Sequence, residues 1–358
     1  MKAIIVGGGV VGLSTAWQLQ RRGCKVVVLE RFRLGHTRGS SHGETRITRS
    51  AYPDPLWVDL VTQANHEDWP RLEREGGVTL VHRRRGCFFG PRSGIITHIA
   101  AAMMAAGVDV GALDASEGAH AFPAFRFAPD DLVLDDHSAG LILAAETMRT
   151  LAHLCASEGV EVREEVRVTA WEASPPRVVA NGKTLEADIL VLAPGPFARE
   201  LLPAAPLRAT RQHVAYYELP AGEHVPVWAS FEDDVHYGLP DMGHGAKVAL
   251  HGTEGSDDPD DDREPDEAAL GEVDAFVRRR FVGEAKRISA EACFYTMAPD
   301  EEFVMDTLGR GVVVGAGLSG HGFKFAPLIG RILTELALDG RSHVAAFEKN
   351  RGRFRLKR

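Results

Sequence analysis

The chain has 358 residues, which is long for a single hydrophobic core and suggests two domains. Its 44% hydrophobic and 25% charged residues are ordinary for a globular protein. The net charge of −9 gives no reason to expect nucleic acid or an anionic membrane as a partner, and no apolar run is long enough to span a bilayer.

The first thirty residues combine two strand patterns, a helix pattern and a glycine motif. Residues 3–6 form a short apolar run that predicts a buried parallel strand. Residues 10–22 have helical periodicity, and residues 25–29 predict a second buried strand. This order of strand, glycines, helix and strand is typical of a dinucleotide-binding unit, for which a cofactor-free α/β turn is the alternative.

Three glycines and one acid supply the binding chemistry of this unit. Gly7, Gly9 and Gly12 fit the pattern G-x-G-x-x-G. In such a pattern the first glycine permits a tight turn, the second lets the backbone approach a pyrophosphate, and the third lets helix and strand pack closely. Glu30, at the end of the second strand, is placed to accept hydrogen bonds from ribose hydroxyls. Because an acid disfavours a 2′-phosphate, the sequence predicts FAD or NAD rather than NADP.

Residues 31–52 are dense in Gly, Ser, His and Arg, which predicts a loop leading into a helix near the cofactor. Arg46 and Arg49 are three positions apart, a spacing that would place them on one helical face. Two like charges so placed would favour anionic partners. A cofactor phosphate, a substrate carboxylate or a structural glutamate would each serve.

The rest of the chain alternates helix and strand patterns. Helices are expected over residues 55–75, 97–106, 146–158, 268–281 and 327–338. Residues 122–139 read as loop-rich. The apolar run at residues 187–196 predicts a buried strand that rejoins the dinucleotide sheet, and residues 312–314 predict another. Residues 208–219 and 225–251 have the short strands and turns of an antiparallel sheet.

These patterns predict an α/β fold with an α+β second domain. The dinucleotide-binding domain, Rossmann-like, is expected to be discontinuous, with residues 1–80, 145–205 and 290–358. An antiparallel-sheet substrate domain, interleaved with it, would comprise residues 81–144 and 206–289.

The cysteines and acidic residues give no sign of a metal site. Cys24, Cys87, Cys155 and Cys293 are scattered without a CxxC pair, which argues against zinc and against a disulfide framework and fits a reducing cytoplasm. The acidic segment 256–267 lacks the glycine and the spacing of an EF-hand loop, so it predicts a solvated surface loop.

Six stretches together resemble one family. They are VGGGVVGLSTAWQLQRRG (6–23), GSSHGETRITRSAY (39–52), ADILVLAPGPF (187–197), GHGAKVALHG (243–252), CFYTMAPDEEFVMD (293–306) and GAGLSGHGFKF (315–325). Their order and content resemble the glycine oxidase/D-amino-acid oxidase group of FAD amine oxidases, and within it the monomeric sarcosine oxidase and N-methyltryptophan oxidase branch. The opening motif is common to many flavoproteins, whereas the last two stretches are more specific.

The resemblance implies FAD as the cofactor and a set of residues that hold it. Cys293 matches the cysteine that the branch joins covalently to the flavin 8α-methyl group. The other cofactor-binding positions implied by the resemblance, beside the glycines and the acid of the first motif, are Ser40, His42, Thr45, Val168, Gly317, Gly320, Gly322 and Lys324.

The resemblance also implies the catalytic and substrate-binding residues. Arg49 and Lys324 match the pair that clamps the substrate carboxylate, and Tyr237 matches an aromatic residue on the substrate side. Arg46 matches an arginine near the flavin ring, and Lys247 a lysine beside flavin nitrogen-5 that assists dioxygen reduction. The matching active-site histidines are His251 and His321.

The implied activity is oxidation of the C–N bond of a secondary amino acid, N-methyl or cyclic, by hydride transfer to FAD. Dioxygen would then be reduced to hydrogen peroxide by a monomeric enzyme. The segment 237–247 departs from the sarcosine enzymes in length and at its tip, so the substrate side chain stays open. Four alternatives remain: a glycine/D-amino-acid oxidase-like enzyme, an amine dehydrogenase with another acceptor, a non-catalytic flavin protein, and an NAD-linked dehydrogenase.

Overall fold

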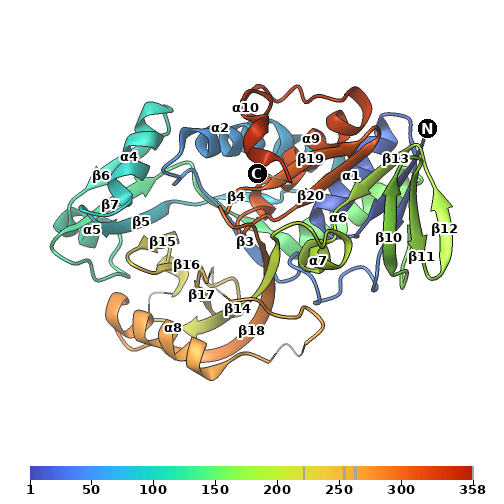
Figure 1. Cartoon of the computed structure of the whole chain (residues 1–358). Helices are drawn as coiled ribbons and strands as arrows, with labels where there is room; N and C mark the ends of the chain where they lie inside the picture. Colours follow the sequence, from blue (N-terminus) through green and yellow to red (C-terminus); the bar gives the residue numbers. More distant parts are fainter. Residues whose placement is uncertain (221, 253–254, 262–263, 357–358) are drawn as a thin grey trace.

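The N-terminal strand lies inside a six-stranded sheet (Figure 1). The structure is a computed structural model, and it describes residues 1–220, 222–252, 255–261 and 264–356. The sheet contains β1 (Lys2–Val6), β2 (Lys25–Leu29), β9 (Glu161–Arg163), β13 (Ile189–Leu192), β20 (Val312–Ala316) and β19 (Val304–Gly309). Their spatial order is β19-β20-β13-β1-β2-β9, with β19 the antiparallel member. The predicted strand over residues 187–196 therefore does rejoin the N-terminal sheet.

Helices cover this sheet because their apolar stripes must be buried against it. Three of them, α1 (Val10–Arg21), α6 (Ala144–Ser157) and α9 (Ala326–Asp339), pack together over a shared core with the strands. Cys24 and Cys155 are buried in that core, as expected of packing residues. Gly340, in the left-handed conformation at φ +70°, ends α9.

An antiparallel three-stranded sheet, β10 (Val168–Ala173), β11 (Pro176–Ala180) and β12 (Lys183–Glu186), lies beside the six-stranded sheet in Figure 1. Its buried residues share a second core with the other face of the six-stranded sheet. The first residue of β10, Val168, is thereby placed near the carboxyl end of β2.

A second large sheet has the order β18-β14-β17-β16-β15-β5-β7-β6 among the described residues. Its strands are β5 (Gly86–Pro91), β6 (Val110–Leu113), β7 (Asp131–Asp136), β14 (Arg208–Glu218), β15 (Val227–Phe231), β16 (Val235–Leu239), β17 (Ala246–Leu250) and β18 (Lys286–Met297). The expected antiparallel pairing holds except between β15 and β5, which are parallel. Helix α8 (Glu267–Arg280) covers one face, where Phe276 stacks on Trp228.

The prediction of a helix carrying Arg46 and Arg49 was wrong. Residues 45–48 form a strand, β3 (Thr45–Thr48), which pairs with β8 (Gly140–Leu143), and β8 also pairs with β4 (Val81–Arg83). β-Branched residues at 45, 47 and 48 favour the extended conformation. The helix begins only after Asp54, whose side chain caps α2 (Pro55–Gln63).

The prediction that residues 122–139 are loop-rich holds at both ends of the segment but missed β7 (Asp131–Asp136) between them. Leu132, Val133 and Leu134 are buried, but the aspartates on both sides of them give the segment a composition that is typical of a loop. Just before this segment, α5 (Ala115–Ala121) begins with a capping box between Asp114 and Glu117 that the sequence reading overlooked.

The remaining elements are short or follow the expected pattern. They are the π-helical turn Ala64–Asp68, α3 (Trp69–Gly76), α4 (Ile96–Ala105), α7 (Ala198–Leu201), α10 (Ala345–Lys349) and the 3₁₀ turns Gly195–Phe197, Gly222–His224, Phe323–Phe325 and Arg351–Phe354. Within the described ranges, no helix is long and apolar enough to cross a membrane, and no cluster of three potential metal-ligating residues occurs. The domain boundaries at residues 80, 144, 205 and 289 stay a prediction.

Candidate active site

A cavity of about 950 Å³ is lined by residues from both large sheets. One end is formed by the β1–α1 turn and by the carboxyl ends of β2 and β13. The other end is formed by one face of β14, β16, β17 and β18, by β3, and by the segment that follows β20. An elongated cofactor with two chemically different halves would fit such a cavity.

The glycines of the first motif fit a bound dinucleotide. A Cβ atom on Gly7, which has φ +101°, would lie 2.3 Å from the carbonyl oxygen of Ala193. A Cβ on Gly12 would lie 1.9 Å from the carbonyl oxygen of Gly7, so the helix can approach the strand only without a side chain there. Gly9 is the N-cap of α1 and lines the cavity, which leaves backbone N–H groups at the positive end of the helix for phosphate.

Substituting Gly12 by alanine is expected to separate α1 from β1 and to abolish flavin binding. Such overpacking typically destabilises by about 1–3 kcal/mol, so a lower Tm should accompany the loss of flavin. Gly271→Ala is the matched control, because this exposed glycine in α8 has no heavy atom within 4 Å of the added Cβ. The flavin content per chain and the Tm are measured for both variants. Unchanged values for Gly12→Ala would contradict this role of the turn.

Glu30 lies where a ribose acceptor is expected. The carboxylate is buried and accepts hydrogen bonds from the backbone N–H groups of Gly8 (2.7 Å) and Phe32 (2.8 Å), with His36 at 3.3 Å. Burial alone would raise the pKa of Glu30, but the hydrogen bonds from His36 and the two backbone groups outweigh it and lower the pKa. An ionised acceptor therefore faces the cavity.

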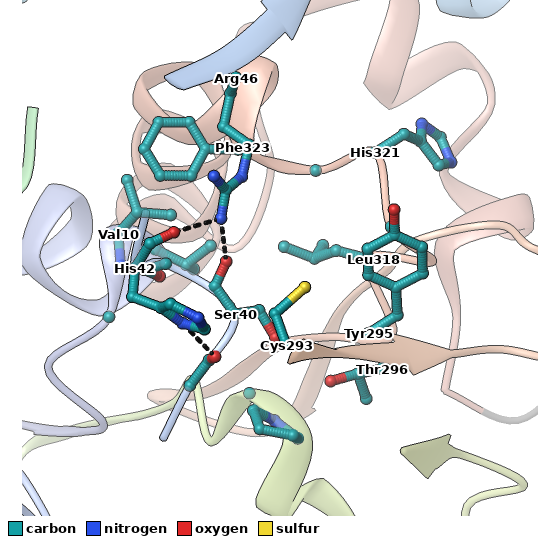
Figure 2. Close-up of a pocket in the computed structure, with 18 of the residues that line it drawn as sticks. Val10, Ser40, His42, Arg46, Cys293, Tyr295, Thr296, Leu318, His321 and Phe323 are labelled. Atoms are coloured by element: carbon teal, nitrogen blue, oxygen red, sulfur yellow. Dashed lines mark hydrogen bonds between the residues drawn. The ribbon is translucent and has the colours of Figure 1, made fainter. Parts of the chain in front are cut away.

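Cys293 lies on the cavity face of β18. Side chains alternate along a strand, so Glu291, Cys293 and Tyr295 share one face, and all three line the cavity. Figure 2 shows the sulfur of Cys293 pointing into the space beside Ser40 and Leu318. The thiol is thus within the cavity rather than in the core, unlike the other three cysteines.

The segment 39–46 wraps this end of the cavity. Ser40 Oγ donates to the carbonyl oxygen of Phe294 (2.5 Å), which ties the segment to β18. The Arg46 guanidinium donates to the carbonyl oxygens of Ser40 (3.0 Å) and His42 (2.5 Å) (Figure 2). It also donates to the carbonyl oxygen of Thr45 (2.9 Å). It also lies over the Phe323 ring, 5.4 Å from the ring centre. These contacts bring together most of the segment's predicted cofactor residues.

The segment after β20 closes the cavity from the other side. Gly317, Gly320 and Gly322 all line the cavity, and the first two have positive φ. A Cβ on Gly320 would lie 2.4 Å from the Tyr295 ring, so this turn can press against β18 only with glycine there. Val168 lines the opposite end of the cavity, and two residues before it the N–H of Val166 donates to the carbonyl oxygen of Glu30.

Two cationic side chains, Lys324 and Arg49, line the same cavity. Lys324 is 3% exposed, and its Nζ donates to Tyr52 Oη (3.0 Å) and to the carbonyl oxygen of His321 (2.9 Å). Arg49 lies over the rings of Tyr52 (4.5 Å) and Phe231 (5.4 Å), and its Nη1 is buried without a hydrogen-bond partner. Among the residues that the structure describes, no acidic side chain forms a salt bridge with either cation.

The pair has no salt bridge of its own, although the charge of the buried Asp136 acts to raise the pKa of Arg49. Burial lowers the pKa of Lys324 well below its usual range, and the adjacent Arg49 lowers it further. Burial likewise lowers the pKa of Arg49. An incoming carboxylate would relieve both effects at once, and its two oxygens match a guanidinium fork and a point charge.

Burial favours the neutral form of the two predicted active-site histidines. Burial lowers the pKa of His251 to about 4 and that of His321 well below its usual range, and nearby cations add to both shifts. His321 Nδ1 is 3.1 Å from Tyr52 Oη, so the imidazole, the phenol and the Lys324 ammonium form one network. These imidazoles therefore line the cavity as polar side chains and add no further positive charge to it.

Lys247 is a further cation that lines the cavity, and its side chain is buried. It is 5% exposed, and its Nζ lies 3.4 Å from the carbonyl oxygen of Thr45. Burial and the nearby Arg46 lower its pKa to about 8. Tyr237 also lines the cavity, and its hydroxyl is 3.0 Å from that of Tyr295.

Three residues of this site were missed by the sequence reading. Tyr52 ends the stretch 39–52 and follows Arg49 by three positions, so proximity alone could have suggested it. Glu291 and Tyr295 flank Cys293 at intervals of two, and the strand period puts all three on one face. The contacts between segments, by contrast, required the sheet register.

Comparisons with known proteins agree with this geometry. The profile of the family described as FAD dependent oxidoreductase matches residues 2–336. The peroxisomal sarcosine oxidase of Mus musculus is 32% identical, over 94% of this chain and 92% of its own length. The monomeric sarcosine oxidase of Bacillus sp. strain B-0618 is 29% identical over 97% and 95%. The open form of NikD, an unusual amino acid oxidase essential for nikkomycin biosynthesis, superposes with a TM-score of 0.83 at 26% identity, covering 95% of this chain and 94% of NikD.

Proposed function

The chain belongs to the family of FAD-dependent oxidoreductases and is an FAD-dependent amine oxidoreductase, and on that premise we propose that it oxidises the C–N bond of a secondary amino acid. The amine would be N-methyl or cyclic, and dioxygen would be reduced to hydrogen peroxide. The observation that carries this proposal is the pair of Lys324 and Arg49, which line the same cavity and of which Arg49 Nη1 is buried without a hydrogen-bond partner.

The residues of the cavity fit FAD in two halves. Gly9, the N-terminus of α1 and the ionised Glu30 suit the pyrophosphate and the ribose. The face of β18 with Cys293, the Arg46 guanidinium and the turn at Gly320 suit the flavin ring. FAD, when bound, accepts the hydride that leaves the carbon next to the amine nitrogen.

The cation pair would orient the substrate by its carboxylate. Arg49 offers a planar fork and Lys324 a point charge held in place by Tyr52. Two fixed positive charges near the substrate also disfavour a protonated amine. The neutral amine keeps the lone pair that stabilises the developing cation at carbon, so no separate base is needed for this step. Water then adds to the resulting iminium, which loses a proton and breaks its C–N bond to give an aldehyde or ketone and an amine.

Lys247 would serve the second half of the reaction. A preorganised positive charge stabilises negative charge that develops on dioxygen as it takes up electrons. The ammonium is buried beside the Thr45 carbonyl and Arg46, so little reorganisation is needed when that charge appears. Two electrons and two protons convert dioxygen to hydrogen peroxide.

The names of the relatives support the substrate class. Sarcosine is an N-methyl amino acid, and the N-methyl-L-tryptophan oxidase of Yersinia pestis is 28% identical over 98% of this chain. A screen for peroxide release tests the proposal directly, with N-methyl and cyclic amino acids compared with primary D-amino acids. Peroxide from secondary amino acids supports it, whereas peroxide from glycine or D-amino acids alone would favour the glycine/D-amino-acid oxidase alternative. Flavin reduction without peroxide would favour another electron acceptor.

We further propose that FAD is joined covalently to Cys293, whose sulfur is directed into the cavity. After acid precipitation the flavin absorbance should stay with the pellet of the wild type and pass to the supernatant for Cys293→Ser, because only a covalent bond survives denaturation. Cys24→Ala is the control, since Cys24 is buried in a core away from the cavity. Release of flavin from the wild-type pellet would rule out the covalent link and leave the fold assignment intact.

The predicted monomeric state and cytoplasmic location belong to the same proposal. No disulfide joins the cysteines in the described part of the chain, which suits a reducing compartment. The Bacillus relative is named a monomeric enzyme. Size-exclusion chromatography with light scattering measures the oligomeric state.

A further inference from the structure

One carboxylate lies beside the buried Lys247. Glu291 Oε1 is 4.0 Å from Lys247 Nζ, and the Glu291 side chain is 35% exposed where Lys247 is 6% exposed. The two residues come from β18 and β17, which are separated by β14 in the sheet. Both line the cavity.

Tyr216 on β14 holds this carboxylate in place. Its hydroxyl donates a hydrogen bond to Glu291 Oε1 (2.6 Å). Tyr216 is also paired in register with Lys247, and the ammonium lies 5.5 Å from the centre of the tyrosine ring. One side chain on the intervening strand therefore contacts both members of the pair, which fixes the position of Glu291 relative to the cation.

The two largest influences on Lys247 oppose its charge, and the strongest that favours the charge comes from Glu291. Burial and the neighbouring Arg46 both favour the neutral amine, whereas Glu291 is the acid that favours the ammonium most strongly. The titratable groups facing Lys247 from the packed elements are Glu44 and Arg46 near β3, Tyr216 on β14, Tyr237 on β16, and Glu291 and Cys293 on β18. Glu44 acts in the same direction as Glu291, but more weakly.

We propose that Glu291 is a positioning residue for Lys247, which it keeps charged and directed into the cavity. The inference rests on the proposed function in one respect, namely that Lys247 supplies the positive charge for dioxygen reduction. Glu291 itself acts only through the lysine. The network of Tyr216, Glu291 and Lys247 then sets the pH range over which reduced flavin is reoxidised rapidly.

The test is the titration of Lys247 itself. Protein labelled with ¹³C at lysine Cε gives one signal for this residue, identified by its disappearance in Lys247→Met. An opposite charge at such a distance shifts a pKa by about one unit or more, so the midpoint in Glu291→Gln should lie about one pH unit below that of the wild type. Glu291→Asp keeps the charge and should restore part of the difference, and Glu44→Gln is the control with a smaller shift.

The titration of Lys247 and the rate of flavin reoxidation test separate parts of the proposal. A midpoint that is the same in Glu291→Gln and the wild type, or that moves as far in Glu44→Gln, would overturn the pairing. The rate of flavin reoxidation by dioxygen is measured separately against pH, and its alkaline limb should move to lower pH with the lysine midpoint. If the midpoint moves while reoxidation is unaffected in both Glu291→Gln and Lys247→Met, the pairing stands and the dioxygen role of Lys247 fails.

Discussion

Lys324→Met is expected to lower kcat/KM for a secondary amino acid by about 10²–10³-fold, because the loss of one partner from a buried charge contact costs about 2–5 kcal/mol. The substrate carboxylate would be left with Arg49 alone, in a pocket where burial already lowers the pKa of both cations. Methionine keeps much of the length of the side chain, so packing against Tyr52 and Phe325 is largely preserved. Steady-state kinetics with a carboxylate-bearing substrate measure the loss.

An N-methyl amine of the same shape without a carboxylate is the internal control for this variant. The wild type should use it poorly, and Lys324→Met should use it no worse than the wild type does. Arg49→Met should give the same pattern, since both residues would contact the same anion. Equal losses with and without the carboxylate would contradict the clamp and would assign Lys324 a purely structural role.

Lys247→Met is expected to slow flavin reoxidation by dioxygen by about 10²–10³-fold, the usual cost of removing a preorganised group that stabilises developing charge. The reductive step with substrate should change little, because Lys247 contacts Thr45 and Glu291 rather than the cation pair. Stopped-flow mixing of anaerobically reduced protein with dioxygen separates the two steps.

The pH dependence of flavin reoxidation tests whether the charged form of Lys247 is the active one. Since the pKa of Lys247 is lowered to about 8, the ammonium is present below that pH and is lost above it. Wild-type reoxidation should therefore slow as pH rises through about 8, and Lys247→Met should lack that limb. Lys286→Met, at the exposed start of β18, is the matched control. Wild-type rates in Lys247→Met would contradict the assignment.

Local sequence patterns predicted the parts of the fold that obey local rules. Gly7, Gly12 and Glu30 have steric or hydrogen-bonding requirements that only a glycine or an acid meets, so their roles can be inferred from sequence order. The buried strands β1, β2 and β13 are continuous apolar runs, as parallel strands are. That is why the interleaving of the dinucleotide sheet could be predicted as well.

The errors arose where tertiary pairing overrides local composition. Arg46 sits on a strand because β3 pairs with β8, which is almost a hundred residues away in sequence. Leu132 to Leu134 are a buried strand, although aspartates on both sides resemble a loop. Propensity is a weak guide in such cases, since burial against distant partners decides the structure.

In the candidate site, too, some residues could be predicted from the sequence, whereas others depend on tertiary pairing. The resemblance pointed to Arg49, Lys324, Lys247 and Cys293, and the fold brings all four to one cavity. The partner that holds Lys324, Tyr52, could have been inferred from its position in a quoted stretch. The link from Tyr216 to Glu291 depends on the register between β14, β17 and β18, which no local pattern contains.

The most direct test of the account is anaerobic mixing of the flavin-loaded protein with a series of N-methyl and cyclic amino acids while the visible flavin absorbance is followed. At least one secondary amino acid should bleach the flavin in a single turnover, and its decarboxylated analogue should react far more slowly. A flavin that stays oxidised with every secondary amino acid in the series, in protein shown to be folded and fully loaded with FAD, would contradict the proposed function.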